Sequence, residues 1–178
     1  MHDVRPARPD DARRIARIQV RGWRAAYRGL IPDELLGQMD IHRHRSFWED
    51  EIRQPTGEVF LVEIEKAVNG FCHVVPSRDP DGEGAFEIVA IYVDPARWRK
   101  GAGRSLCQAA MASVSLKGAK WFTLWVLAGN LPGRRFYESL GFLADGAVKS
   151  EMLRGSRLDE VRYRMDLRVG GEVGRLKG

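Results

Sequence analysis

Apolar residues recur along the chain with two different spacings, and the spacing predicts where helices and strands lie. From Pro9 to about Tyr27 they recur every three or four positions while arginines fall largely on the other side, which predicts an amphipathic helix with a solvated face. A second helix is predicted to begin at Pro32, to break near Asp40 and to continue over Ile41–Ile52. A short strand, Asp3–Ala7, is expected before them.

Beyond Gly57 the spacing changes to the two-residue alternation of strands, and a mixed sheet is predicted. A hairpin turn is expected at Asn69-Gly70 and a polar loop at Ser77–Gly84. The expected strands are Val59–Ile64, Phe71–Val75, Ala85–Val93, Ala119–Leu127, Phe142–Lys149 and Leu158–Asp166, and the expected helices are Gly101–Leu116 and Leu131–Leu140. This order predicts one α/β domain over residues 1–168, followed by a mobile tail at 169–178.

The stretch from Tyr92 to Arg104 joins an apolar strand to a cationic turn that begins a helix. Gly101 and Gly103 lack the Cβ that would keep a ligand from the backbone, and the unpaired N–H groups of a helix start bind anions. Four cations occur within eight positions: Arg97, Arg99, Lys100 and Arg104. The pattern favours a phosphate-binding turn, and a solvated basic turn with closely packed glycines is the alternative. Leu106 stands where the dinucleotide fingerprint needs its third glycine.

Downstream, the segment Asn130-Leu-Pro-Gly-Arg-Arg-Phe-Tyr-Glu-Ser-Leu-Gly-Phe142 follows a predicted strand. With the glycine turn before it, the chain resembles the GNAT superfamily of N-acetyltransferases over roughly Glu87 to Phe142. The resemblance implies a mixed, mostly antiparallel twisted sheet flanked by helices, with a splayed parallel strand pair at its centre. Trp98 departs from the Arg or Gln that many members carry, and we expect it to be tolerated because backbone N–H groups do most of the phosphate binding.

The resemblance also implies acetyl-CoA as co-substrate and assigns residues to it. The implied cofactor-binding residues are Ile91, Val93, Arg99, Lys100, Gly101, Ala102, Gly103, Arg104, Asn130 and Tyr137. For Ile91 and Val93 the implied contact is through the main chain. Spacing alone would make Asn130 a plain helix cap, and the resemblance favours a site.

Glu87 is the first catalytic candidate. Two-residue alternation places Glu87, Val89, Ile91 and Val93 on one face of their strand. A carboxylate beside an apolar wall can take the proton that an alkylammonium must lose before its nitrogen attacks. The resembling family often has a glutamate with this role at this place. The alternative is a solvated strand-end glutamate paired with a cation.

Tyr137 is the second catalytic candidate, seven residues or about two helical turns after Asn130. On periodicity alone Tyr137 could be a core aromatic beside Phe136. The resemblance favours a phenol that gives its proton to the departing thiolate or holds the thioester sulfur in place.

Composition narrows the classes of function that remain open. The 178 residues carry a net charge of +5, but basic residues are spread among 24 acids without a nucleic-acid motif, which argues against nucleic-acid binding as a main role. Cys72 and Cys107 are expected to be buried free thiols, and no Cys/His spacing predicts a metal. No signal segment or membrane-length apolar run occurs, so a cytoplasmic protein is expected.

The sequence therefore predicts an N-acetyltransferase that moves an acetyl group to a primary amine by direct attack, without an acyl-enzyme. A catalytically silent acyl-CoA-binding module is the alternative. The acceptor is left open between a small-molecule amine and a protein amine, and a homodimer is among the assemblies considered. Residues Gly29–Ile52 and Ser77–Gly84 are expected to frame the acceptor pocket.

Overall fold

The computed structural model describes residues 2–153 and 155–168, and the expected tail at 169–178 lies outside the described residues. The helices are α1 (Ala12–Ala26), α2 (Asp33–Gly37), α3 (Ile41–Arg53), α4 (Ala102–Leu116) and α5 (Leu131–Glu138), with 3₁₀ turns at Pro9–Asp11 and Pro95–Arg97. The strands are β1 (Asp3–Pro6), β2 (Glu58–Ile64), β3 (Ala67–Pro76), β4 (Ala85–Val93), β5 (Trp121–Leu127), β6 (Leu143–Leu153) and β7 (Ser156–Asp166). Within the described residues, no helix combines the length and apolar character needed to cross a membrane.

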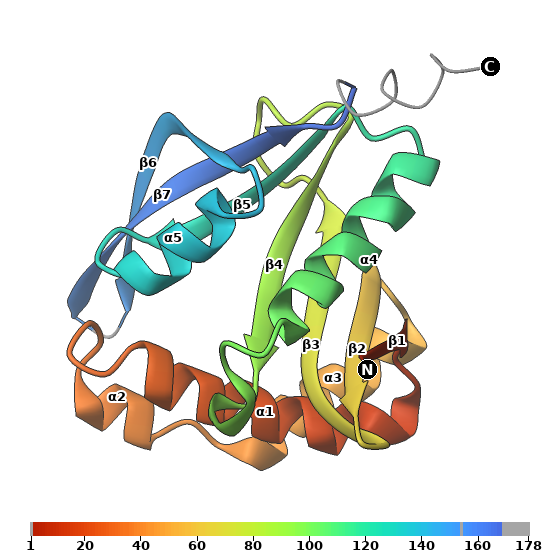
Figure 1. The fold of residues 1–178 in the computed structure, drawn as a ribbon. Helices are drawn as coiled ribbons and strands as arrows, with labels where there is room; N and C mark the ends of the chain where they lie inside the picture. Colours follow the sequence, from red (N-terminus) through yellow and green to blue (C-terminus); the bar gives the residue numbers. More distant parts are fainter. Residues whose placement is uncertain (1, 154, 169–178) are drawn as a thin grey trace.

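The seven strands form one mixed sheet in the order β1-β2-β3-β4-β5-β7-β6. The central β4–β5 pair is parallel, and its pairing joins Ala85–Ile88 to Trp121–Leu124 and stops there. The second halves of the two strands therefore diverge, as Figure 1 shows. The expected architecture, a mixed and mostly antiparallel sheet with a splayed parallel pair at its centre, is confirmed.

Helices cover both faces of the sheet, and each face buries a core (Figure 1). α4 and α5 pack on one face, where Leu106, Phe122 and Tyr163 are buried. α1 and α3 pack on the other face around Ile15 and Trp48. The apolar residues of α1 recur every three or four positions and form the predicted buried stripe. The strand β4 is thus held between two helical layers.

The β2–β3 hairpin turns at Glu65-Lys66, so the predicted turn at Asn69-Gly70 is wrong. Glu65 and Lys66 have φ angles of 54° and 62°, which suit the twist of a two-residue hairpin turn. Gly70 lies within β3, where a Cβ would come within 3.0 Å of the carbonyl oxygen of Tyr92. Close packing between strands therefore requires this glycine, and in sequence it looks the same as a turn glycine.

A β-bulge in β4 changes which side chains share a face. Val89 has no partner in β3, although the residues on either side of it are paired. Because a bulge adds one residue, the alternation reverses beyond it. Glu87 therefore lies on the α1 side of the sheet with Tyr92, while Ile91 and Val93 lie on the α4 side. The predicted shared face for these residues is wrong, because counting along one strand cannot detect an extra residue relative to its neighbour.

Candidate functional site

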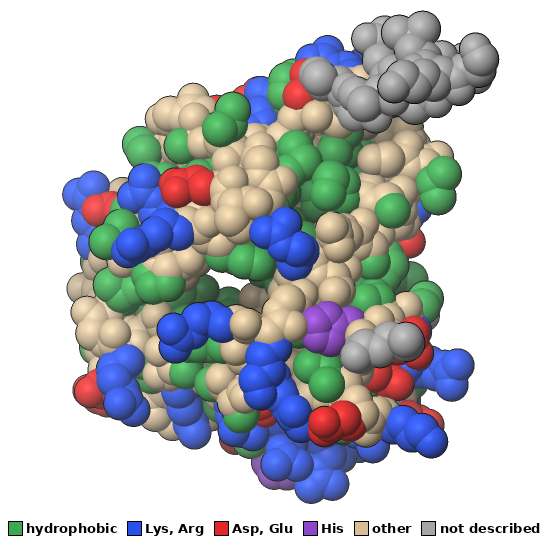
Figure 2. Space-filling view, in the orientation of Figure 1, with side chains coloured by type: hydrophobic (Ala, Val, Ile, Leu, Met, Phe, Trp, Pro, Cys, Tyr) green, Lys and Arg blue, Asp and Glu red, His purple; other side chains and the backbone are tan. Residues whose placement is uncertain are grey.

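A cleft of about 750 Å³ opens where β4 and β5 diverge. Its wall combines the end of α1, the second half of β4, the turn before α4, the end of β5 and the start of α5. Figure 2 shows the hollow, with Lys and Arg side chains around its mouth. The expected cofactor-binding residues that line it are Ile91, Val93, Arg99, Gly101, Ala102, Gly103, Arg104, Asn130 and Tyr137. Lys100 and Glu87 are not among the lining residues.

The first turn of α4 points its backbone towards this cleft. Gly101 is the N-cap in the left-handed conformation with φ of 85°, which glycine adopts at little cost. No side chain among the described residues caps the helix start. The N–H groups of Ala102, Gly103 and Arg104 lack intrahelical partners by their position, and the helix dipole adds positive potential there. The arrangement suits a phosphate or another anion.

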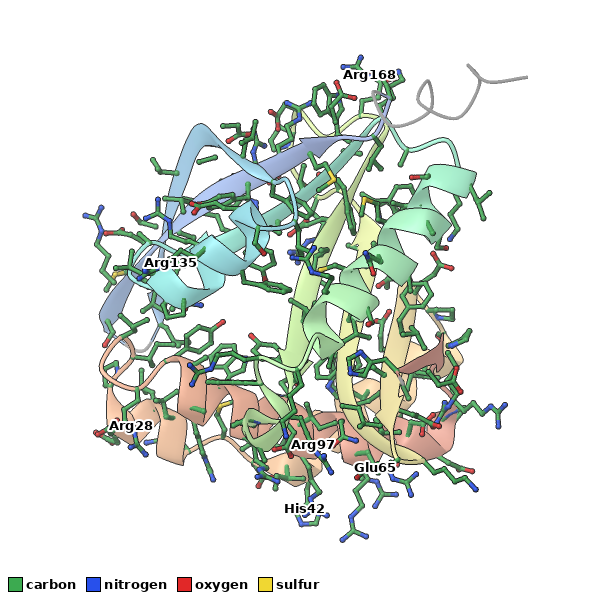
Figure 3. All side chains as sticks on the ribbon, viewed as in Figure 1. Arg28, His42, Glu65, Arg97, Arg135 and Arg168 are labelled. Carbon is green, nitrogen blue, oxygen red and sulfur yellow. The ribbon has the colours of Figure 1, made fainter. Side chains whose placement is uncertain are left out.

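The cations of the turn differ in their surroundings. Arg97 pairs with Glu65 at 3.0 Å, and Figure 3 labels both residues at the lower end of the sheet. Arg104 lines the cleft and donates hydrogen bonds to the carbonyl and hydroxyl oxygens of Ser139. Arg99 lines the cleft and is exposed. Arg99 and Arg104 are therefore the cations best placed to meet an anion at the start of α4.

Trp98 has a structural role that explains how the turn accommodates it. Its indole N–H donates a 2.7 Å hydrogen bond to the carbonyl oxygen of Val93. This bond ties the turn to the end of β4, and it engages a backbone group that the family resemblance had assigned to the cofactor. Where many family members carry a polar Arg or Gln, this chain thus has an aromatic residue whose N–H makes a hydrogen bond inside the chain.

Gly103 is constrained by packing as well as by the cleft. A Cβ at this position would lie 3.1 Å from Cζ of Phe136, which projects from α5. That distance is shorter than a normal contact, so the glycine lets α4 and α5 approach each other. The glycine therefore has a packing role in addition to its place in the cleft wall.

Asn130 begins α5 and borders the cleft. Its Oδ1 accepts a hydrogen bond from the N–H of Gly133 at 3.1 Å, so it is the helix cap that spacing alone suggested. The same cap orients α5, and its residue lines the cleft together with Tyr137. The cap and the site are therefore compatible interpretations of Asn130.

Tyr137 lies on the cleft wall with its ring packed between Phe136 and Phe142. Burial raises the pKa of its phenol well above the usual value. The hydroxyl therefore stays protonated at neutral pH and is able to donate a hydrogen bond or a proton. Tyr137 thus packs as an aromatic residue and also borders the cleft, so the two interpretations of it from sequence are compatible.

Glu87 is buried, with 2% of its surface exposed, and it is held by Arg78 from the β3–β4 loop. The guanidinium donates two hydrogen bonds to the carboxylate, at 2.6 and 3.1 Å. Those bonds raise the pKa of Arg78 further. The predicted cation partner of a strand-end glutamate is thus present, although the carboxylate is buried rather than solvated. Since Glu87 does not line the cleft, direct contact with a ligand there is not part of this geometry.

Two tyrosines that sequence reasoning missed also line the cleft. Tyr27 follows the end of α1 and Tyr92 lies in β4, and their hydroxyl oxygens are 3.1 Å apart. Burial is the main cause that raises the pKa of each phenol. Only the reversed alternation after the bulge turns Tyr92 towards α1, so no local signal could have paired these residues. Trp125 of β5 lines the cleft as well.

The cysteines carry no reactive thiol. Burial raises the pKa of Cys107 to about 12, and it raises the pKa of Cys72 well above its usual value. Both residues are buried and free, as expected from sequence. Among the described residues, no group of three or more His, Cys, Asp or Glu is arranged to hold a metal.

A second groove of about 410 Å³ lies between the helical layer and the β6–β7 hairpin. Its lining includes Met39, Asp40 and Phe47 from the region expected to frame an acceptor pocket. Asp40 is already engaged, because its carboxylate caps α3 at the N–H groups of His42 and Arg43. The loop over residues 77–84 lines neither this groove nor the main cleft.

Comparisons with known proteins agree with the fold. The sequence matches the acetyltransferase (GNAT) family over residues 22–142. An uncharacterized N-acetyltransferase, YuaI of Bacillus subtilis (strain 168), is 31% identical over 140 residues, which cover 78% of this chain and 79% of the relative.

Two solved structures share the fold. The PaiA N-acetyltransferase from Thermoplasma acidophilum, in complex with coenzyme A, superposes with a TM-score of 0.73 at 18% identity, covering 93% of this chain and 99% of that one. YncA from Salmonella typhimurium, with its cofactor acetyl-CoA, gives 0.71 at 22% identity and covers 94% of each chain. At these identities the two structures support the fold alone.

Proposed function

The chain belongs to the GNAT family of acetyltransferases, and on this premise we propose that it transfers an acetyl group from acetyl-CoA to a primary amine by direct attack. The observation that carries the proposal is one cleft that unites the uncapped start of α4, the splay of β4 from β5 and the Tyr137 phenol. Each of these supplies a different requirement of acetyl transfer: phosphate binding, a slot for an extended chain, and a proton donor.

The chain's own groups fit the binding of acetyl-CoA. The left-handed Gly101 and the amides of the first turn of α4 would hold the pyrophosphate, with Arg99 and Arg104 beside them. Backbone groups of β4 beyond Ile88 have no partner in β5, so those other than the Val93 carbonyl, which Trp98 engages, would bind the amide-rich arm of the cofactor. Bound acetyl-CoA supplies the acetyl group as an activated thioester.

Tyr137 is assigned the role of assisting the leaving thiolate. As the amine nitrogen forms its bond to the acetyl carbon and the carbon–sulfur bond breaks, the phenol gives its proton to the sulfur or holds it by a hydrogen bond. The raised pKa of Tyr137 keeps the phenol protonated, so that its hydroxyl can donate a hydrogen bond to the sulfur as negative charge develops there. A covalent acyl-enzyme is not needed, and the buried thiol of Cys107 is not suited to forming one.

The acceptor is assigned to the α1 side of the sheet, where Glu87, Tyr92 and Tyr27 lie. The two linked phenols would position the amine by hydrogen bonds, because both line the cleft. Glu87 would take the amine proton through a water rather than by contact, since its carboxylate is held by Arg78 outside the lining. These roles place the acceptor amine on the α1 side of the acetyl carbon and the Tyr137 phenol of α5 beside the leaving sulfur.

A thiol-release assay with acetyl-CoA tests the proposal. The acceptor panel should contain alkylamines, amino acids, polyamines, peptides with free amino termini and peptides with an internal lysine. We expect acceptor-dependent release of CoA and an acetylated amine in the product mass spectrum. Tight binding of CoA with no turnover on any acceptor would favour the catalytically silent acyl-CoA-binding module. Absence of CoA binding would refute the assignment of the α4 turn.

A further inference from the structure

One long border of the sheet lacks a partner strand among the described residues. β6 is last in the strand order and pairs with β7 alone. In Figure 1 it forms the outer border of the molecule beyond β7. After an irregularity between Ala144 and Val148, its pairing with β7 is regular over Val148–Leu153. The outward backbone groups of such an edge are able to pair with another strand, and no proline interrupts this stretch.

The side chains of this stretch are unusually apolar on one face. Val148 is 73% exposed and Met152 is 68% exposed. They lie two residues on either side of Ser150, so alternation puts all three on the same face. This is the face of the α4 and α5 layer, because Val148 pairs with Val161, which packs against that core. Two large exposed apolar side chains on an edge strand are typical of a surface that binds another strand.

The opposite face of the same stretch carries two charges of opposite sign. Lys149 and Glu151 lie one residue on either side of Ser150. The ammonium of Lys149 is 3.1 Å from Glu160 and 3.6 Å from Glu151, over the ring of Trp125. The side chain of Glu151 is 67% exposed. A further cation is therefore able to reach the Glu151 carboxylate from outside.

The geometry of antiparallel strands selects how this segment would pair with itself. In antiparallel strands, two residues face each other only when both point their backbone N–H and C=O groups towards the partner strand or both point them away. Successive residues of one strand alternate in this direction, so a two-fold axis must lie level with a residue and not between two residues. An axis through Ser150 sets Val148 against Met152 of the second copy and Lys149 against Glu151 of the second copy. Moving the axis one residue either way breaks both matches, because Val148 would then face Ser150, or Lys149 would face Leu153.

We propose that the chain forms a two-fold symmetric dimer in which β6 pairs antiparallel with β6 of a second copy, centred on Ser150. The sheet then continues across both subunits, each contact occurs twice, and apolar and charged pairs lie on opposite faces. The occupant of the edge is a second copy rather than another protein, because the segment Val148–Met152 is complementary to itself in both charge and apolar character. The proposal does not depend on acetyl transfer.

Sedimentation equilibrium tests the charge matching. The native chain should be a dimer at about 100 µM, a concentration that detects even weak association. Lys149→Glu places acid opposite acid twice, and should weaken the dimer by at least about tenfold. The double variant Lys149→Glu, Glu151→Lys exchanges the charges and should recover most of the affinity. A monomeric native chain, or a double variant as weak as the single one, would overturn the proposal. Circular dichroism of each variant checks that it is folded.

Cross-linking tests the position of the axis. Ser150→Cys brings two thiols together on the axis, so mild oxidation should give a covalent dimer, while Cys72 and Cys107 are buried and do not interfere. Ser115→Cys, an exposed position at the end of α4, is the matched control and should stay monomeric on a denaturing gel. Equal cross-linking of the two variants, or none at Ser150→Cys, would show that β6 does not pair in this register.

Discussion

Tyr137, Tyr92 and Tyr27 come from three separate parts of the chain and line one cleft. Burial raises the pKa of all three phenols, so at neutral pH they donate hydrogen bonds or protons and do not act as bases. If the acceptor arrives as an ammonium, its proton must go elsewhere. Glu87 is the carboxylate on the same face of β4 as Tyr92, which is why we assign that proton to it.

Replacing Tyr137 with Phe deletes one hydroxyl and keeps the ring that packs on Phe142. We expect turnover to fall by roughly 10²-fold or more, with the acetyl-CoA dissociation constant nearly unchanged. Steady-state kinetics and calorimetric titration measure the two effects. Tyr163→Phe is the control, because its buried hydroxyl bonds Glu138 at 2.6 Å and Tyr163 is not among the cleft residues. That variant should lose stability and keep its turnover, and wild-type turnover by Tyr137→Phe would remove the proton-donor role.

Glu87→Gln preserves the size of the side chain and removes its ability to take a proton. At neutral pH we expect a loss of roughly 10²-fold in turnover, partly recovered as pH rises and free amine accumulates, while acetyl-CoA affinity is retained. The pH–rate profile is the measurement. Arg78→Gln breaks the same ion pair but leaves the carboxylate, so it separates the role of Glu87 as a proton acceptor from its role as an ion-pair partner. If both variants lose thermal stability and neither changes the profile, Glu87 is a structural partner of Arg78 only.

At the level of elements, the position of the cleft depends on two contacts between segments that are far apart in sequence. The bulge at Val89 exists only relative to β3, and it decides that Tyr92 faces α1. The close approach of α4 and α5 depends on Gly103 beside Phe136. The first contact reverses the face that local periodicity had assigned to the end of β4. The second brings together two helices that local periodicity had not paired.

Gly103→Val is expected to disturb the α4–α5 contact and the cleft together, because its Cβ would press on Phe136. The fall in thermal midpoint and the loss of CoA binding would then have a common cause. Adding Phe136→Leu makes room between the helices and should restore much of the stability. CoA binding by calorimetry should stay lost in this double variant, since the valine side chain still lies beside the phosphate-binding amides. Recovery of both properties would mean that Gly103 serves packing alone.

At the scale of the whole molecule, the stability of the fold should depend on pH through His73. This residue is 5% exposed, and burial lowers its pKa below 6.5, although the nearby Glu51 opposes the shift. Its Nε2 is 3.2 Å from Glu51 Oε1 but is not aligned for a hydrogen bond. His73 therefore binds a proton less readily in the folded chain than in the unfolded chain.

The sign of the effect follows from proton binding. Above pH 6.5 both states carry neutral His73 and its contribution is constant. As pH falls through this value the unfolded state gains the proton first, so the unfolding free energy should decrease, with a limiting slope of about 1.4 kcal/mol per pH unit. Urea unfolding at a series of pH values measures it. His73→Asn should flatten the decrease, and His42→Asn, exposed on α3 and labelled in Figure 3, should not.

Much of the fold and part of the site could be predicted from the sequence, because their signals are local. Periodicity placed the helices and most strands to within a few residues, since it reports which side of a segment is apolar. Gly101 marked the start of α4, because only a residue without a Cβ adopts its left-handed conformation at little cost. The order of the glycine turn and the Asn130 segment indicated the family, which the comparison over residues 22–142 confirms.

Only the tertiary structure decided which of these residues meet. The pairing of β4 with β3 created the bulge, turned Tyr92 towards Tyr27, and separated Glu87 from the face of Ile91. Folding also placed Arg78 on Glu87 from the β3–β4 loop. Register between strands is set by side chains on both strands and by the packing of whole layers. A pattern read along a single segment contains no information about such contacts, so residues distant in sequence could be brought together only by the folded chain.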